Sequence, residues 1–143
     1  ELIGRVACAC GGVEVLKRPA SLAADDVPSV PVFQHILEHF PCDVHVNFNI
    51  NFPLCAPAVV ERALRLVPEK GEVLSVPYAV WAQSAECLKN YGDPWDITAY
   101  PFDAPDAGQI DVHTEADLLE VHRLLQKNAS PWTEASVCPG PCV

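Results

Sequence analysis

The sequence has no methionine, few basic side chains and no long apolar run. Nine lysines and arginines stand against 19 aspartates and glutamates in 143 residues, which gives a formal net charge of −10. Proteins that bind the phosphate backbone of nucleic acids present a surface rich in lysine and arginine. A membrane helix needs about 20 apolar residues in succession, and no stretch approaches that length. We therefore expect neither a nucleic-acid partner nor a membrane partner.

Two further absences concern the start of the chain. No long apolar region follows the basic residue near the start, as it would in a secretory leader, so we expect a cytoplasmic protein. A translated chain begins with methionine, and one of this length usually holds a few more. We therefore expect either an excised or processed piece or a sequence from which modified residues have been lost.

The composition that is present belongs to a folded protein. Half of the residues are hydrophobic and the mean hydropathy is +0.13, which excludes a disordered chain. A chain of this length is expected to form one domain. We assign residues 1–128 to an α/β domain and residues 129–143, which hold three prolines and show no periodicity, to a tail.

Seven cysteines are scattered along the chain, an odd number that does not fit a secreted disulfide framework. The two terminal pairs could together supply four thiolates to a zinc ion. However, a C-x-C spacing falls outside the usual zinc knuckle, and reduced thiols are the favoured interpretation. The other three have apolar neighbours and are expected to be small buried side chains. The pairs are Cys8/Cys10 and Cys138/Cys142, and the other three are Cys42, Cys55 and Cys87.

Apolar periodicity predicts strands that alternate with helices. Ser29 is expected to cap the first helix, and Thr114 and Asp117 are expected to form a capping box on the last. The spacing places Val32, Phe33, Ile36, Leu37 and Phe40 on the buried face of the first helix, and Leu118, Val121 and Leu125 on that of the last. Helices are predicted over 29–40, 57–67 and 114–128, a helical turn over 84–89, and strands over 13–16, 43–50, 72–78, 97–102 and 109–112.

This alternation predicts right-handed βαβ units and a mostly parallel sheet. In an open α/β sheet, ligands bind outside the carboxyl ends of the strands. Two strand ends carry polar side chains suited to chemistry, those that follow residues 43–50 and 109–112. We therefore expect the site at one or both of them.

Three asparagines share one side of the strand over 43–50 and its exit. Asn47, Asn49 and Asn51 alternate with Phe48 and Ile50, so the amides face away from the apolar side chains. Amides are costly to bury without hydrogen-bond partners, so they line either a wet pocket or a polar strand edge. A pocket is favoured because the strand runs directly into a proline-containing turn before a helix.

The second place is the pair Asp111 and His113, which share a face where a strand leads into a helix. An aspartate and a histidine can hold a divalent cation, and a helix N-terminus favours an anionic phosphate. The alternative, which we favour from the residues alone, is that both side chains are local caps of the helix. Elsewhere, His35 and His39 lie one helical turn apart without an evident third ligand, and a solvated helix face is expected.

At these places the sequence resembles the acylneuraminate and 3-deoxy-manno-octulosonate cytidylyltransferases. Residues 13–25 resemble the "VEVxxRPxxLAxD" stretch of CMP-sialic acid synthetases. Residues 46–54 are similar to the "VNVQGDEPL" strand and turn of the octulosonate branch, and residues 110–118 resemble the late "IDxDTxEDL" element. The three matches occur in the family's order and span most of the chain.

The resemblance implies a three-layer α/β/α nucleotidyltransferase-like (Rossmann-like) fold that is N-terminally incomplete in this chain. The family's enzymes use CTP and Mg²⁺ to place CMP on the anomeric hydroxyl of an acidic sugar, with release of pyrophosphate. The metal neutralises the phosphates while the hydroxyl attacks in line. By position, Asp111 would be the catalytic and metal-binding carboxylate, and the substrate-binding residues would be Arg18, Asn49, Asn51 and His113.

The sequence also departs from the family pattern. Asn51 stands where the octulosonate branch has a metal-binding aspartate, His113 replaces the second aspartate of the late D-x-D, and no glycine-rich basic segment matches the phosphate cradle. One hypothesis is a truncated or diverged CMP transferase with impaired activity. The other is a non-catalytic nucleotide- or sugar-binding or interaction protein on the same scaffold. We also expect a homodimer, formed through an exposed sheet edge or through the region 81–100.

Overall fold

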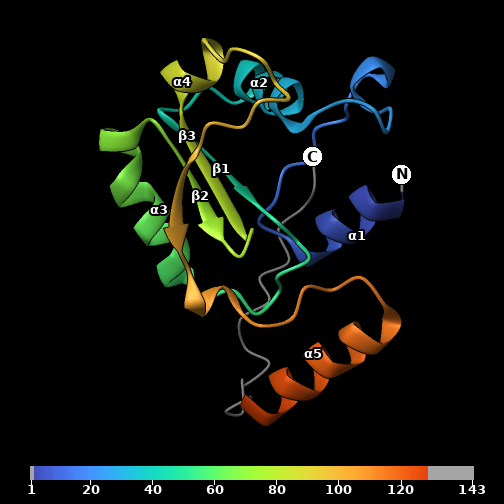
Figure 1. Cartoon of the computed structure of the whole chain (residues 1–143). Helices are drawn as coiled ribbons and strands as arrows, with labels where there is room; N and C mark the ends of the chain where they lie inside the picture. The colour runs from blue at the N-terminus through green and yellow to red at the C-terminus, as the bar shows by residue number, and fades with distance from the viewer. Residues whose placement is uncertain (1, 129–143) are drawn as a thin grey trace.

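The computed structural model describes residues 2–128 and contains a four-stranded sheet with helices around it (Figure 1). This confirms an α/β fold. The predicted tail and the distal cysteine pair lie outside the described residues. The helices are α1 (Leu2–Cys10), α2 (Ser29–His39), α3 (Pro57–Lys70), α4 (Ala85–Lys89) and α5 (Glu115–Asn128), and the strands are β1 (Val44–Phe48), β2 (Glu72–Val76), β3 (Val80–Ser84) and β4 (Tyr100–Asp103).

The strand order is β1-β3-β2-β4, with β3 antiparallel to both neighbours and β2 parallel to β4. Strands β1, β2 and β4 therefore point one way and β3 points the other. The prediction of a mostly parallel sheet is wrong, because β3 lies between β1 and β2 and pairs antiparallel with both. Strands β1 and β4 form the edges, and the homodimer through an edge stays a prediction.

A tight turn explains why β3 reverses direction directly after β2. The Ser75 hydroxyl donates to the Pro77 carbonyl oxygen at 2.7 Å, and its oxygen accepts the backbone N–H groups of Ala79 at 3.0 Å and Val80 at 2.9 Å. These bonds close the chain into a hairpin. Periodicity does not predict β3, because the apolar run after Pro77 is short and has no alternation.

Two predicted strands are absent. Residues 13–16 pair with no other strand, and residues 109–112 make a single backbone bond, from the Val112 N–H to the Asn51 carbonyl oxygen at 2.9 Å. Gly108, with φ of 89°, approaches Leu54 so closely that an added Cβ would lie 3.3 Å from the Leu54 Cβ. The chain therefore turns below the sheet instead of extending it (Figure 1).

Two apolar clusters lie on opposite faces of the sheet. Along β3, Val80 and Ala82 belong to the cluster under α3, whereas Trp81 belongs to the cluster under α2 and α4. Alternate residues of a strand point to opposite faces, which assigns the helices to the two sides. The α3 cluster includes Val59, Ala63, Val67, Val73 and Phe102, and the other cluster consists of Val30, Phe33, Leu37, Trp81 and Leu88.

The predicted helix faces are buried only in part. Phe33 and Leu37 of α2 are buried, but Phe40, just after the helix, is 40% exposed. On α5, Val121 is buried but Leu118 and Leu125 are exposed, since this helix lies away from the sheet (Figure 1). Ser29 is the first residue of α2 and not its cap, which is Pro28. No helix within residues 2–128 is long and apolar enough to cross a membrane.

Candidate functional site

The structure brings the two predicted places together at the carboxyl end of β1. The hydrogen bond from the Val112 N–H to the Asn51 carbonyl oxygen joins the turn after β1 to the segment before α5. A second bond, from the Ala56 N–H to the Asp106 carbonyl oxygen at 2.9 Å, holds the same two segments side by side. Asn51 and the pair Asp111 and His113 therefore belong to one surface.

The asparagines of this turn have different roles. The Asn49 side chain donates to the Tyr78 carbonyl oxygen at 3.1 Å and accepts the Asn51 N–H at 3.1 Å, so it stabilises the turn. The Asn47 amide donates to the Tyr78 hydroxyl at 3.1 Å. By contrast, the half-buried Asn51 side chain makes no hydrogen bond to any residue between 2 and 128. Asn51 is therefore the asparagine whose amide is left to bind a ligand.

Asp111 and His113 form an exposed pair. The Asp111 Oδ1 lies 3.0 Å from the His113 Nε2, with 47% and 65% of the respective side chains exposed. Exposed ion pairs contribute only about 0–1 kcal/mol, so a ligand can replace this contact at little cost. The pair is therefore open to a ligand from solvent.

The hypothesis that Asp111 and His113 cap α5 does not fit the structure. The Asp117 carboxylate accepts the N–H groups of His113 and Thr114, and the Asp117 N–H donates to the Thr114 hydroxyl at 3.3 Å. This confirms the predicted capping box. Hydrogen bonds from the Thr114 hydroxyl and from the two backbone groups lower the pKa of Asp117. Thr114 and Asp117 thus cap the start of α5 reciprocally, and neither the Asp111 nor the His113 side chain takes part in this box.

Arg18 lies in a different groove. This groove has a volume of about 660 Å³ and runs between the N-terminal segment and α2. Neither Asn51 nor Asp111 is among the residues that line it. They are Gly12, Glu14, Leu16, Arg18, Val32, Ile36 and Phe40.

The residues around Asp111 fit Mg²⁺ poorly. Mg²⁺ requires near-octahedral oxygen ligands and is commonly held by one or two carboxylates together with substrate phosphates. Among residues 2–128, Asp111 and His113 are not joined by a third aspartate, glutamate, histidine or cysteine at metal-binding distance. We therefore derive no reaction step through a metal at this site.

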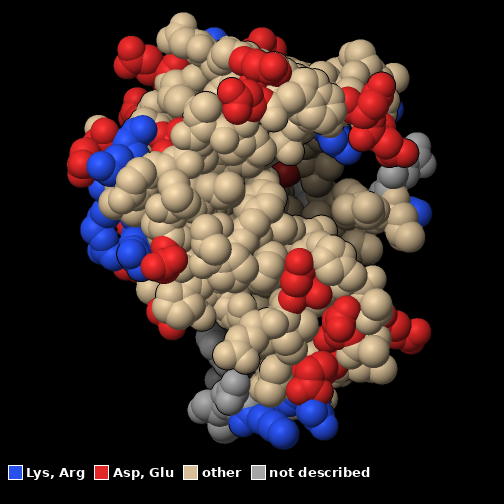
Figure 2. All heavy atoms as spheres, in the orientation of Figure 1, with Lys and Arg blue, Asp and Glu red and all other residues tan. Residues whose placement is uncertain are grey.

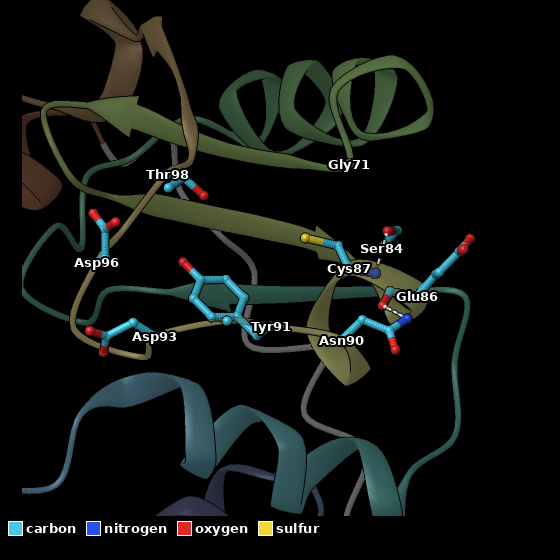
Figure 3. A pocket seen from close by; sticks show the side chains of 10 residues that line it. Gly71, Ser84, Glu86, Cys87, Asn90, Tyr91, Asp93, Asp96 and Thr98 are labelled. Carbon is cyan, nitrogen blue, oxygen red and sulfur yellow. Dashed lines mark hydrogen bonds between the residues drawn. The ribbon is translucent and has the colours of Figure 1, made fainter.

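A second cavity, which periodicity does not predict, opens at the opposite end of the sheet (Figure 3). It has a volume of about 590 Å³ and lies between the end of β3, α4 and the loop that follows α4. Figure 3 shows the Tyr91 ring and the Cys87 thiol extending into it. The only sequence signal for it is the aromatic and acidic segment 91–96. The lining residues are Gly71, Ser84, Glu86, Cys87, Asn90, Tyr91, Gly92, Asp93, Asp96 and Thr98.

A buried carboxyl group lies beside this cavity. Glu72 is 4% exposed and accepts hydrogen bonds from Trp81 Nε1 and Gln83 Nε2, both at 2.8 Å, and from the Tyr91 hydroxyl at 3.4 Å. Burial, with the neighbouring Glu72 carboxylate, raises the pKa of Tyr91 to about 12. Burial and then the Glu72 charge also raise the pKa of the Cys87 thiol. Both groups are therefore held in their neutral forms.

The cysteines should differ in their rates of alkylation. Cys42 is exposed, contrary to the predicted burial, whereas Cys87 is half-buried with a raised pKa. Because the thiolate is the nucleophile, we expect iodoacetamide at pH 8 to modify Cys42 several-fold faster than Cys87. Peptide mass mapping over time measures both rates in one sample. Equal rates, or faster modification of Cys87, would contradict the assigned environments.

Charge is distributed unevenly over the face in Figure 2. Lysine and arginine gather at the left over α3 and at the bottom over the end of α5, while aspartate and glutamate are spread over the rest. This face therefore offers no continuous basic surface for a polyphosphate. No protein-family model matches the sequence, and a search of curated proteins finds no match either.

Proposed function

We propose that this chain binds a nucleotide or an acidic sugar on a three-layer cytidylyltransferase-like scaffold and does not transfer CMP. Asn51, Asp111 and His113 would hydrogen-bond the hydroxyl groups of the ligand. The observation that carries the proposal is the hydrogen bond between the Val112 N–H and the Asn51 carbonyl oxygen. It joins the turn that carries Asn51 to the segment that carries the exposed Asp111 carboxylate, which supports a shared binding surface. Amides and carboxylates are the side chains that hydrogen-bond hydroxyl groups best.

Three features favour binding over transfer. Asp111 is a lone carboxylate beside one histidine, and these two ligands would bind Mg²⁺, which such a transfer needs, only weakly. The asparagine at position 51 lacks the charge of an aspartate. Arg18, the basic residue expected near the substrate, lines a separate groove. The second candidate function, CTP-dependent transfer of CMP to an acidic sugar, is supported by the order of the three resembling segments.

The Asp111→Asn variant should bind CMP or an acidic sugar about tenfold to a hundredfold more weakly than the parent chain. A hydrogen bond to a charged group contributes about 1.5–3 kcal/mol, and each 1.4 kcal/mol is tenfold in affinity. Binding is measured by chemical-shift titration of CMP, CTP and acidic sugars. Asp93→Asn, in the opposite cavity, is the matched control and should bind like the parent.

Three results would overturn the proposal, two from the titration and one from an assay of turnover. An absence of binding at millimolar ligand would remove the binding function, and an equal loss in Asp93→Asn would assign binding to the other cavity. A pyrophosphate-release assay with CTP, Mg²⁺ and acidic sugars tests the second candidate. Turnover above background that disappears in Asp111→Asn would establish transfer and contradict a non-catalytic role.

A further inference from the structure

Helix α2 carries a cluster of potential metal ligands on the side turned away from the core. A ring nitrogen of His35, a ring nitrogen of His39 and a carboxylate oxygen of Glu38 all lie within 4.8 Å of one another. Residues three and four apart on a helix share a face. The core face of α2 is formed by Val30 and Phe33 with Leu37, so the cluster does not belong to the core. Glu38 is the third ligand that the histidine spacing alone does not indicate.

A backbone hydrogen bond fixes the tautomer of His39. Its Nδ1 lies 2.9 Å from the His35 carbonyl oxygen. A carbonyl oxygen only accepts, so Nδ1 carries the proton and Nε2 presents its lone pair. Histidines that bind metals usually donate their other N–H to a backbone carbonyl or a carboxylate in this way.

The His35 ring has a polar atom without a partner. Its Nε2 is shielded from solvent and makes no hydrogen bond to the part of the chain that the structure describes. The two imidazole rings lie with their centroids 4.3 Å apart at an angle of 63°. A shielded nitrogen without a partner costs free energy that coordination to a cation would recover.

We propose that His35, Glu38 and His39 form a binding site for a divalent transition metal ion of the zinc type. Two imidazoles and one carboxylate suit Zn²⁺, Ni²⁺ or Cu²⁺, whereas Mg²⁺ and Ca²⁺ prefer an all-oxygen shell. A tetrahedral zinc with bonds of about 2.0–2.1 Å needs ligand atoms about 3.3 Å apart, so small side-chain rotations close the site. Glu38 and His39 are exposed, which leaves a fourth position to solvent. The site is separate from Asp111 and does not depend on the proposed function.

The test measures Zn²⁺ binding to the full chain, free of any affinity tag and kept reduced, by competition with a chromogenic zinc indicator. We expect saturable binding that weakens about a hundredfold in His39→Gln and at least about tenfold in Glu38→Gln, since even loss of a supporting contact costs 10–100-fold. His122→Gln is the matched control, because His122 is exposed on α5, its Nε2 lies 3.0 Å from Gln126 Nε2, and it belongs to no ligand cluster among the described residues. It should bind zinc like the parent.

Co²⁺ provides a second measurement with a spectroscopic signature. Nitrogen and oxygen ligands should produce visible ligand-field bands without the near-ultraviolet charge-transfer band of a thiolate. Zinc should also raise the melting temperature of the parent and of His122→Gln, but not that of His39→Gln. Zinc binding that is lost in Asp111→Asn or after thiol alkylation, or that is unchanged in His39→Gln, would overturn the proposal. An absence of saturable binding would do the same.

Discussion

Replacing Glu72 with alanine should lower the free energy of unfolding by about 2–6 kcal/mol, because two buried donors lose their acceptor at about 1–3 kcal/mol each. The donors are Trp81 Nε1 and Gln83 Nε2, both 2.8 Å from the same carboxyl oxygen. Both side chains are almost fully buried, so water cannot replace the missing acceptor. Urea unfolding followed by tryptophan fluorescence measures the change.

Two further variants make this result specific. Glu72→Gln keeps one acceptor oxygen and should lose less stability than Glu72→Ala. Glu61→Ala, on the exposed side of α3 with a 3.9 Å contact to Arg65, should change stability by no more than about 0.5 kcal/mol. A loss in Glu72→Ala as small as that in Glu61→Ala would contradict the buried network.

Glu72→Gln should also change the pH at which Tyr91 ionises. The pKa of Tyr91 is raised from 10.0 to about 12 by burial, by the Glu72 charge and by the Glu72 hydrogen bond. A raised pKa in the folded state stabilises the fold fully below pH 10, and this stabilisation is lost as the pH rises towards 12. In Glu72→Gln the Tyr91 pKa should fall, which an ultraviolet titration of tyrosinate detects.

The second large effect is expected at Phe33. Its ring contacts His45 with centroids 4.6 Å apart and Trp81 with centroids 5.3 Å apart, and it is 6% exposed. Phe33→Ala should lower the free energy of unfolding by about 3–5 kcal/mol, the usual cost of removing a buried aromatic ring.

Phe40 provides the matched control for Phe33. It is the same residue type at the C-terminal end of the same helix, but it is 40% exposed. Phe40→Ala should cost clearly less, about 1 kcal/mol, since much less apolar surface is lost from the interior. The two variants are compared in one urea series, and equal losses would mean that the two rings are buried to a similar degree.

Parts of the candidate site at Asn51 and Asp111 could be predicted from residues that lie close together in the sequence. The capping box of Thr114 and Asp117 could be predicted because both partners lie within one helical turn. The turn after β1 could be predicted because alternation and a proline mark where the strand ends. The contact between Asn51 and Val112 could not, since it joins residues 61 positions apart through one backbone bond.

The cavity beside Tyr91 depends on long-range packing in the same way. Its walls come from the residue before β2, the end of β3 and the loop after α4, and the first two meet because β3 folds back antiparallel along β2. The Ser75 hydrogen bonds close that reversal, which no periodicity reveals. The metal-ligand cluster differs, because its three residues lie within one turn of α2 and the bond that holds the His39 ring, to the His35 carbonyl oxygen, is also local.

Local pattern was sufficient for the α/β class and for the positions of α2, α3 and β1, because helix and strand periods are properties of neighbouring residues. The low basic charge and the lack of a long apolar run likewise led us to expect neither a nucleic-acid nor a membrane partner, and this stays a prediction. Only the tertiary structure decided strand direction and which apolar side chains are buried. Leu118 and Leu125 have helical spacing like that of Phe33, yet they are 56% and 51% exposed, because α5 has no sheet face to cover. Whether an apolar side chain is buried depends on the elements that pack against its helix or strand, whereas periodicity specifies only which side chains share a face.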